Sequence, residues 1–266
     1  MKIVLLSYNH PELTTRSLES IRALAQDSNI LLIHNGSLAQ HQKALQSRFP
    51  EVEHLVLEKN HHFSGGANAG LKRAFETCEW VLFLTNDCQL LHFEIPSESP
   101  ALIAPLICGR KEGRIDSIGG RFVVDKAHLS HCKTEREFLS AENSYVPGTA
   151  FWLHREVFTL VQGFDESLQT YWEDVDFSMR VREQGYPLRA DLRTRLIHAI
   201  GKTCHKDIHY TTYLYQRNRK RISLKYSSRK LSVYGALWSS WIKTSARLAR
   251  RQEWDRLRLL RQASRD

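Results

Sequence analysis

Residues 80–87 read WVLFLTND, five apolar side chains followed by Thr85, Asn86 and Asp87. A short apolar run that ends in polar residues is typical of a buried strand whose carboxyl end reaches the edge of a sheet. A carboxylate at such an edge can hold a hard divalent cation that bridges a diphosphate. Aspartate is also common in turns that merely end a strand, so Asp87 alone is compatible with both interpretations.

The same pattern occurs upstream of this strand. Apolar runs over Lys2–Leu6, Ile30–Ile33 and His54–Leu57 alternate with segments of helical periodicity that end near residues 25, 49 and 78. Strands alternating with helices predict a parallel, doubly wound α/β sheet with right-handed crossovers. Ligands bind outside the carboxyl ends of the strands in such sheets. The polar residues expected at these ends are Ser7, Tyr8, Asn9, His34, Asn35 and Asn86.

Residues 60–70, NHHFSGGANAG, form a glycine-rich stretch, which we expect to be a loop over 60–66 that opens a helix. Backbone amides at a helix start suit an anion, and glycines allow it to approach closely. The alternative is a tight loop that needs glycine dihedral angles. The stretch is neither a Walker loop nor a GxGxxG fingerprint, which weakens both of those interpretations.

Residues 173–176, EDVD, place three carboxylates in the first turn of a helix expected over 173–184, with Gly185 as its stop. Acidic residues there stabilise the helix dipole by about 0.3–1 kcal/mol each, which is one explanation. Adjacent carboxylates also raise one another's pKa, and a general base exploits such a shift. Tyr171 and Trp172, which precede the helix, could wall a sugar or base pocket.

The 266-residue composition, 42% hydrophobic and 25% charged, excludes a disordered or collagenous chain. No run of about 18 apolar residues occurs, and the N-terminal run is too short for a signal peptide. The cysteines are odd in number and form no CxxC pair, so we expect reduced thiols and a cytoplasmic location. They are Cys78, Cys88, Cys108, Cys132 and Cys204.

The net charge of +9 is confined to the C-terminal end. Residues 1–216 carry 23 Lys and Arg against 26 Asp and Glu, whereas residues 217–266 carry 15 against 3. Apolar residues with helical spacing interleave with these cations between Leu231 and Leu260. Such a tail can lie on an anionic membrane as a peripheral anchor, pack on the body or on a second copy, or bind nucleic acid. The near-neutral body disfavours nucleic acid.

Ten motifs follow one another in order along residues 1–225. They are SYN 7–9, NGS 35–37, the stretch 60–70, ND 86–87, DSIG 116–119, PGTAFWLHRE 147–156, GFDE 163–166, YWEDVDFSMR 171–180, His198 and RNR 217–219. This set resembles the family-2 glycosyltransferases, especially bacterial rhamnosyl- and galactofuranosyltransferase-like members. The resemblance implies a GT-A, Rossmann-like nucleotide-binding fold with a mixed central sheet. We expect this domain over residues 1–215 and a basic helical extension over 216–266.

The resemblance also implies a chemistry. A metal-dependent enzyme of this kind moves a sugar, with inversion, from a nucleotide-diphosphate donor such as a dTDP- or UDP-sugar to a hydroxyl of a surface glycan or lipid-linked saccharide. Asp174 would be the general base, with its neighbour Glu173 as the next candidate, and Asp87 and His198 would bind Mg²⁺ or Mn²⁺. Tyr171 and Trp172 would line the acceptor pocket. The implied donor-binding residues are Ser7, Tyr8, Asn9, His34, Asn35, Gly65, Gly66, Asn68, Asn86, Asp87 and Arg217.

Three features depart from the family pattern. Asn86 precedes Asp87 where a second acid is usual, and His34 stands where the family has an aspartate that accepts from a pyrimidine ring. The region between Glu94 and Asn143 is also short.

Two other functions are alternatives to the one that this resemblance implies. One is a nucleotidyltransferase, which lacks support because no glycine-rich motif with a basic residue lies near the N-terminus. The other is a non-catalytic glycan- or membrane-binding protein on a transferase scaffold. Retention of Asp87, Asp174 and His198 disfavours the latter.

Overall fold

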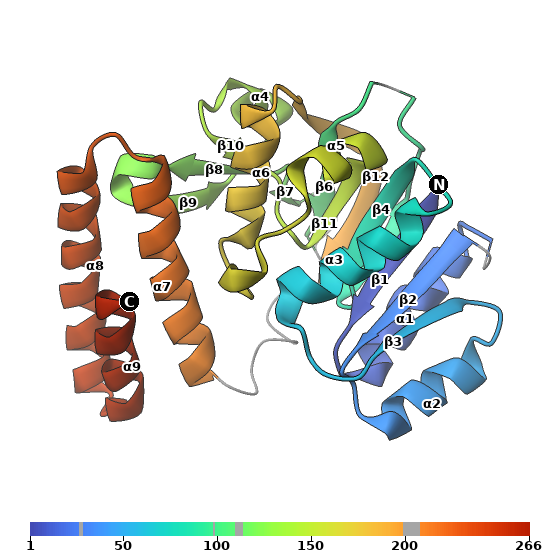
Figure 1. The fold of residues 1–266 in the computed structure, drawn as a ribbon, viewed down its shortest axis with the longest axis horizontal. Coiled ribbons are helices and arrows are strands. Elements are labelled where there is room, and N and C mark those ends of the chain that lie inside the picture. The colour runs from blue at the N-terminus through green and yellow to red at the C-terminus, as the bar shows by residue number, and fades with distance from the viewer. Residues whose placement is uncertain (27–28, 98, 110–113, 199–207) are drawn as a thin grey trace.

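The computed structural model describes residues 1–26, 29–97, 99–109, 114–198 and 208–266. Residues 1–85 alternate strands and helices as the sequence predicts (Figure 1). The elements are β1 (Lys2–Ser7), α1 (Pro11–Arg22), β2 (Ile30–Asn35), α2 (Ala39–Arg48), β3 (Glu53–Leu57), α3 (His62–Phe75) and β4 (Trp80–Thr85). Strands β3, β2, β1 and β4 are parallel neighbours, which brings their carboxyl ends to one edge.

The sheet continues past β4 with mixed direction, so the expected mixed central sheet is confirmed. Its order is β3-β2-β1-β4-β11-β6-β12-β5, with β7 paired to β6, and β11 runs antiparallel to β4. A smaller sheet has the order β10-β8-β9. These strands are β5 (Cys88–His92), β6 (Leu102–Cys108), β7 (Ile115–Ser117), β8 (Gly120–Val123), β9 (His128–His131), β10 (Ser144–Tyr145), β11 (Ala150–His154) and β12 (Leu188–His198).

Helices cover both faces of the main sheet. On one face Leu18 of α1 and Leu45 of α2 pack against the β-strand side chains of Ile3 and Leu5. On the other face α3 joins α5 (Arg155–Val161) and α6 (Glu173–Glu183) over the alternate strand residues. Helix α4 (Glu135–Ser140) and the short 3₁₀ turns η2 (Val124–Lys126) and η3 (Glu166–Leu168) complete this part. Burial on both faces explains why the strands read as continuous apolar runs.

Helix α3 begins at His62, so the expectation of a loop over 60–66 is wrong. Gly66 lies inside the helix, where a Cβ atom would stand 2.6 Å from Nδ2 of Asn35 in β2. The glycine is needed for close packing of the helix on the sheet rather than for a loop conformation.

The C-terminal region consists of α7 (Ile208–Tyr226), α8 (Lys230–Arg250) and α9 (Trp254–Arg265), which lie together at one end of the molecule (Figure 1). The division that we expected after residue 215 falls within α7. This helix is tied to α6 because Lys225 and Tyr226 both donate to the buried carboxylate of Asp176. No helix among the described residues is long and apolar enough to cross a bilayer.

Candidate active site

A cavity of about 290 Å³ lies where α6 meets the carboxyl end of β4. It brings together six residues that the sequence marks for catalysis, metal binding and the acceptor pocket. These are Asp87, Tyr171, Trp172, Glu173, Asp174 and His198. The remaining lining residues are Phe63, Thr85, Leu129, Gly148, Thr149, Thr170 and Tyr215.

Asp87 and His198 meet because of strand pairing. Asp87 lies in the turn between β4 and β5, and the antiparallel register of β12 on β5 sets His198 opposite Cys88, the next residue. Nε2 of His198 thereby lies 3.2 Å from Oδ2 of Asp87. The hydroxyl of Thr85 donates to Oδ1 of Asp87 at 2.7 Å and orients the carboxylate.

The donor set at this corner fits a cation that is shared with a substrate. One carboxylate and one imidazole converge at the cavity, whereas no group of three or more His, Cys, Asp or Glu side chains in the described ranges could hold an ion. Mg²⁺ in phosphate-transferring sites has only one or two carboxylates as protein ligands, and phosphate oxygens and water complete its shell. Asp87 and His198 are therefore suited to an ion that arrives with a diphosphate.

Glu173 and Asp174 are the first two residues of helix α6, and their carboxyl groups differ in hydrogen bonding and pKa. Asp174 accepts from the backbone N–H of Gly148 at 3.1 Å and of Val175 at 2.8 Å. Burial raises the pKa of Asp174, and these two hydrogen bonds partly oppose that rise. Burial, reinforced by the charge of Asp174, raises the pKa of Glu173 well above its usual range, and Oε2 of Glu173 has no partner among the described residues. Asp174 is thus the member of the pair that ionises first.

The residues just before α6 are held in a strained conformation. Tyr171 and Trp172 both have φ near +70°, a backbone conformation that residues other than glycine rarely adopt. Such strain costs on the order of 1–3 kcal/mol for each residue and persists only where surrounding structure enforces it. Asn218 of α7 supplies that structure, because its buried Nδ2 donates to the carbonyl oxygens of Leu168 at 2.7 Å and of Tyr171 at 2.8 Å.

Three aromatic rings form one wall of the cavity. The ring of Tyr215 meets those of Tyr171 and Trp172 edge-on, with centroids 5.8 and 5.9 Å away. Phe122 of β8 packs edge-on against Trp172, with centroids 5.5 Å apart. This arrangement supplies an apolar face next to the carboxylates, which suits the face of a sugar ring.

The polar residues at the strand ends form a hydrogen-bonded network beside this cavity. The backbone N–H of Asn9 donates to Oγ of Ser37 at 2.9 Å and joins the loops after β1 and β2. Nδ2 of Asn86 donates to Oγ1 of Thr14 at 3.1 Å, and that oxygen lies 2.7 Å from Oγ of Ser7. These contacts hold the loops in place, and none of the five residues lines the cavity.

His34 lies beneath the surface, whereas Tyr8 is 41% exposed at the same edge. Nε2 of His34 lies 2.9 Å from Nδ1 of His54, whose Nε2 lies 2.9 Å from the carbonyl oxygen of Phe49. A carbonyl only accepts, so with both rings neutral His54 donates to Phe49 and His34 donates to His54. Burial and then the neighbouring His54 lower the pKa of His34 to about 4. Its Nδ1 is left as a buried acceptor without a partner in the described part of the chain.

Several expected donor-binding residues have structural contacts instead of cavity contacts. Asn35 accepts from the N–H of His61 at 3.0 Å and donates to the carbonyl of His62 at 2.7 Å, which fixes the start of α3. Gly65 and Gly66 pack within that helix. None of these residues lines the cavity.

Asn68 and Arg217 act on the segment that leads to α6. Asn68 makes two hydrogen bonds with the backbone of Phe164, at 2.8 and 2.9 Å. Gly163 has φ +73°, and a Cβ there would stand 2.5 Å from Oδ1 of Asn68. Arg217 donates to the carbonyl oxygen of Ser167 at 3.0 Å. Both residues lie outside the cavity and position the chain that enters it.

The sequence interpretation missed Tyr215, Thr85 and the role of Asn218. Thr85 directly follows the apolar run and could have been included from its place at the strand end. Asn218 belongs to the RNR motif, but the motif does not indicate its hydrogen-bond partners, and Tyr215 carries no local signal. Both reach the site because α7 packs on the segment before α6.

Solved structures share this arrangement of sheet and helices. The crystal structure of GalNAc-T7 with UDP, GalNAc and Mn²⁺ matches with a TM-score of 0.60 at 16% identity, over 82% of this chain and 47% of that chain. The mannosyltransferase PcManGT from Pyrobaculum calidifontis in complex with GDP-Man and Mn²⁺ matches with a TM-score of 0.56 at 12% identity, over 99% and 85%. At these identities the likeness concerns the fold, which is the GT-A fold of glycosyltransferases.

The chain belongs to glycosyl transferase family 2, whose family model matches residues 2–160. That match includes Asp87 and ends before α6. The O-antigen biosynthesis protein RfbC of Myxococcus xanthus is 23% identical over 218 residues, which is 71% of this chain. The chain spans only 16% of the length of that relative.

Proposed function

We propose that the protein transfers a sugar, with inversion, from a nucleotide-diphosphate donor to a hydroxyl of a surface glycan or lipid-linked saccharide. The observation that carries this proposal is one cavity that joins two acidic corners, Asp87 with His198 and Glu173 with Asp174. A transferase of this kind needs a place for the leaving diphosphate and a base for the acceptor. Membership of glycosyl transferase family 2 supports the reaction class.

Asp174 is the base in this mechanism. Its carboxylate takes the proton of the acceptor hydroxyl as that oxygen forms a bond to the anomeric carbon. The bond from the anomeric carbon to the diphosphate oxygen breaks in the same step, and the nucleoside diphosphate leaves with the electron pair. Attack from the face opposite the leaving group inverts the anomeric centre. The N–H groups of Gly148 and Val175 fix the carboxylate in position.

Asp87 and His198 are the residues that would hold a divalent ion, Mg²⁺ or Mn²⁺. When bound, such an ion supplies positive charge to the leaving diphosphate and stabilises it. Thr85 keeps the carboxylate of Asp87 directed at this corner through its hydroxyl. The complexes of GalNAc-T7 and PcManGT with Mn²⁺ support a divalent ion in this fold.

The other lining residues select and orient the acceptor. The aromatic wall of Tyr171, Trp172 and Tyr215 offers a face on which a sugar ring can pack. Glu173, whose raised pKa keeps it protonated, can donate a hydrogen bond from its carboxyl group without competing with Asp174 for the proton. The O-antigen relative supports a surface glycan as the product.

A dTDP- or UDP-sugar is the donor that we favour. Tyr8 is the exposed side chain at the edge where the base would lie, and the buried Nδ1 of His34 is an acceptor near the end of β2. Contacts of Ser7, Asn9, Asn35, Asn86 and the remaining predicted donor-binding residues with the nucleotide stay predictions. GalNAc-T7 and a Staphylococcus aureus TarS fragment, the latter with a TM-score of 0.51 at 15% identity, were solved with UDP, whereas PcManGT was solved with GDP-Man.

The test is a panel of nucleotide sugars with Mn²⁺, scored by thermal stabilisation. A ligand that binds the folded state at 100 times its Kd stabilises it by about 2.7 kcal/mol. We expect a nucleotide-diphosphate sugar to raise the Tm, release nucleoside diphosphate with an acceptor present, and give a product of opposite anomeric configuration by NMR. Stabilisation by nucleoside triphosphates alone, with pyrophosphate release, would identify a nucleotidyltransferase and overturn the proposal.

A further inference from the structure

The three C-terminal helices bury only part of their apolar surface among themselves. Leu248 of α8 packs with Leu257 and Leu260 of α9, and Trp241 joins this cluster. Lys220 of α7 donates to the carbonyl oxygen of Ser264 at 2.9 Å and holds the end of α9. Packing among the three helices therefore explains why these apolar residues are buried.

Four further large apolar side chains of α8 face solvent. Leu231, Tyr234, Trp238 and Ile242 are 89%, 51%, 64% and 47% exposed. Their spacing of three, four and four residues places them on one face of the helix, and we call this set the α8 stripe. An exposed apolar patch of this kind marks a contact with a partner or a membrane.

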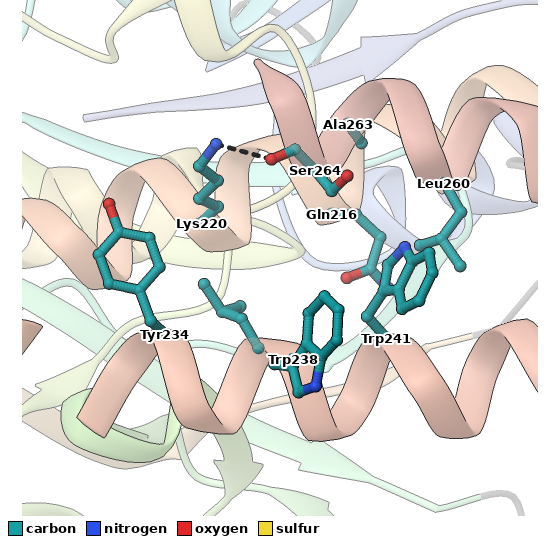
Figure 2. A pocket seen from close by; sticks show the side chains of 9 residues that line it. Gln216, Lys220, Tyr234, Trp238, Trp241, Leu260, Ala263 and Ser264 are labelled. Carbon is teal, nitrogen blue, oxygen red and sulfur yellow. Dashed lines mark hydrogen bonds between the residues drawn. The ribbon is translucent and has the colours of Figure 1, made fainter. Parts of the chain in front are cut away.

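A cavity of about 180 Å³ opens beside the α8 stripe (Figure 2). Its apolar walls are Tyr234, Leu237, Trp238, Trp241, Leu260 and Ala263. The indole rings of Trp238 and Trp241 stack with centroids 5.4 Å apart. An apolar recess next to an exposed aromatic stripe has the chemistry to accept an aliphatic chain.

The region that carries the stripe is strongly basic. Residues 217–266 hold 15 Lys and Arg against 3 Asp and Glu. Lys220 of α7 lines the recess itself, whereas Lys243 and Arg247 lie on the other side of α8 from the stripe. A second copy placed symmetrically on the stripe would bring two basic regions together. Nucleic acid would need cations at the centre of the contact, where the stripe presents apolar side chains. An anionic lipid surface satisfies both features, because apolar side chains enter the interface while the basic helices are attracted to the phosphates.

We propose that the α8 stripe docks the protein on an anionic lipid bilayer, with the recess between α7, α8 and α9 taking part of one lipid chain. Tryptophan and tyrosine are the side chains enriched at the level of lipid headgroups. Helix α7 links this surface to the candidate active site, because Tyr215 lines the active-site cavity while Gln216 and Lys220 line the recess. In the docked enzyme, one helix, α7, thus connects the aromatic wall of the active-site cavity with the lipid.

Vesicle sedimentation of the full chain tests this proposal. We expect binding to vesicles that contain phosphatidylglycerol and little binding to phosphatidylcholine alone. Trp238→Ser with Ile242→Ser should weaken binding at least tenfold. Binding by the wild type should weaken as the salt concentration rises, because salt screens the attraction of the basic helices for lipid phosphates. The matched control is Leu139→Ser, which alters an exposed residue of α4 and should leave binding unchanged.

A second measurement locates the contact. Vesicles with brominated acyl chains should quench the tryptophan fluorescence of the wild type, and Trp238→Phe should lose most of that quenching. Equal quenching in both proteins, equal binding by the stripe and control variants, a stripe-dependent dimer in light scattering, or preferred binding to duplex DNA would each overturn the proposal. Asp174→Asn should bind vesicles as the wild type does, so this test fails or succeeds independently of the proposed transfer reaction.

Discussion

The side-chain amide of Asn218 lies 2.8 Å from the carbonyl oxygen of Tyr171, although the two residues are 47 positions apart. Asn218 is fully buried, and its amide also contacts the carbonyl of Leu168. Tyr171 has φ +70°, a conformation that the local sequence does not favour. Helix α7 therefore holds the strained segment that aims Glu173 and Asp174 into the cavity.

Asn218→Ala should lower kcat at least tenfold while changing the donor KM little. Loss of the amide leaves carbonyl oxygens of the segment without a donor, which costs about 1–3 kcal/mol and frees the strained backbone. The matched control is Ser223→Ala on the same helix, because Ser223 is equally buried and its hydroxyl has no partner among the described residues. Equal kinetics in Asn218→Ala and the wild type would show that the segment keeps its position without this amide.

The strands of the parallel half were predictable to within one or two residues. A strand buried on both faces reads as a continuous apolar run, and β4 over Trp80–Thr85 differs from the expectation by Thr85 alone. The start of α3 was predicted wrongly, because Gly65 and Gly66 suggest a loop in sequence. Gly66 is instead required by the close approach of α3 to Asn35, which is a property of the tertiary structure.

The site residues that stand in local sequence motifs were predictable, whereas those that reach the site through the packing of α7 were not. Asp87 and the Glu173–Asp174 pair stand in local patterns of strand end and helix start. Tyr215 and the amide of Asn218 contribute because α7 packs on the segment before α6, a contact that neither residue's local sequence indicates. The composition shift near residue 215 marks where the basic charge begins, and it falls inside that continuous helix. Cys204 lies outside the described residues, and the other four cysteines are free.

Glu173→Gln should keep more than about a third of wild-type turnover. The pKa of Glu173 is raised by burial and by Asp174, so its carboxyl is already protonated and glutamine reproduces its neutral form. The pKa of Asp174 is also raised, and the base must be ionised. Turnover should therefore fall as the pH decreases. The midpoint of this fall should lie above about 3.9, the ordinary pKa of aspartate. A loss in Glu173→Gln as large as that in Asp174→Asn would assign the base to Glu173.

Asp87→Ala and His198→Ala should weaken donor binding only in the presence of Mg²⁺ or Mn²⁺. Both side chains lie at the corner of the cavity suited to a diphosphate-bound ion. The matched control is His92→Ala, an imidazole of β5 whose Nδ1 faces the carbonyl of Arg193 instead. Isothermal titration of each protein with the donor, once in the presence of the metal ion and once in the presence of a chelator, measures the affinity. Equal affinity of the wild type under both conditions would remove the basis for an ion at this corner.

Asp176→Asn should lower the free energy of unfolding by about 3 kcal/mol at neutral pH. The buried carboxylate accepts from Arg180 at 2.7 Å and from Lys225 at 2.7 Å. Burial alone would raise the pKa of Asp176, but the hydrogen bond from Lys225 and the charge of Arg180 outweigh it, and the pKa is lowered. A lowered pKa stabilises the fold above the unfolded value near 3.9, and that stability is lost as the pH falls. Denaturant titration of both proteins should show a difference that shrinks below about pH 4; a difference independent of pH would contradict this assignment.

The central claim is that Asp174 removes the proton of an acceptor hydroxyl during sugar transfer. The most direct test is to measure turnover and donor affinity of Asp174→Asn with the nucleotide sugar that the screen identifies. We predict that transfer is abolished while the Kd for the donor stays within about twofold, because Asp174 lies on the acceptor side of the cavity. Retention of more than about a tenth of wild-type turnover, a loss below about 1.4 kcal/mol of transition-state stabilisation, would contradict the account.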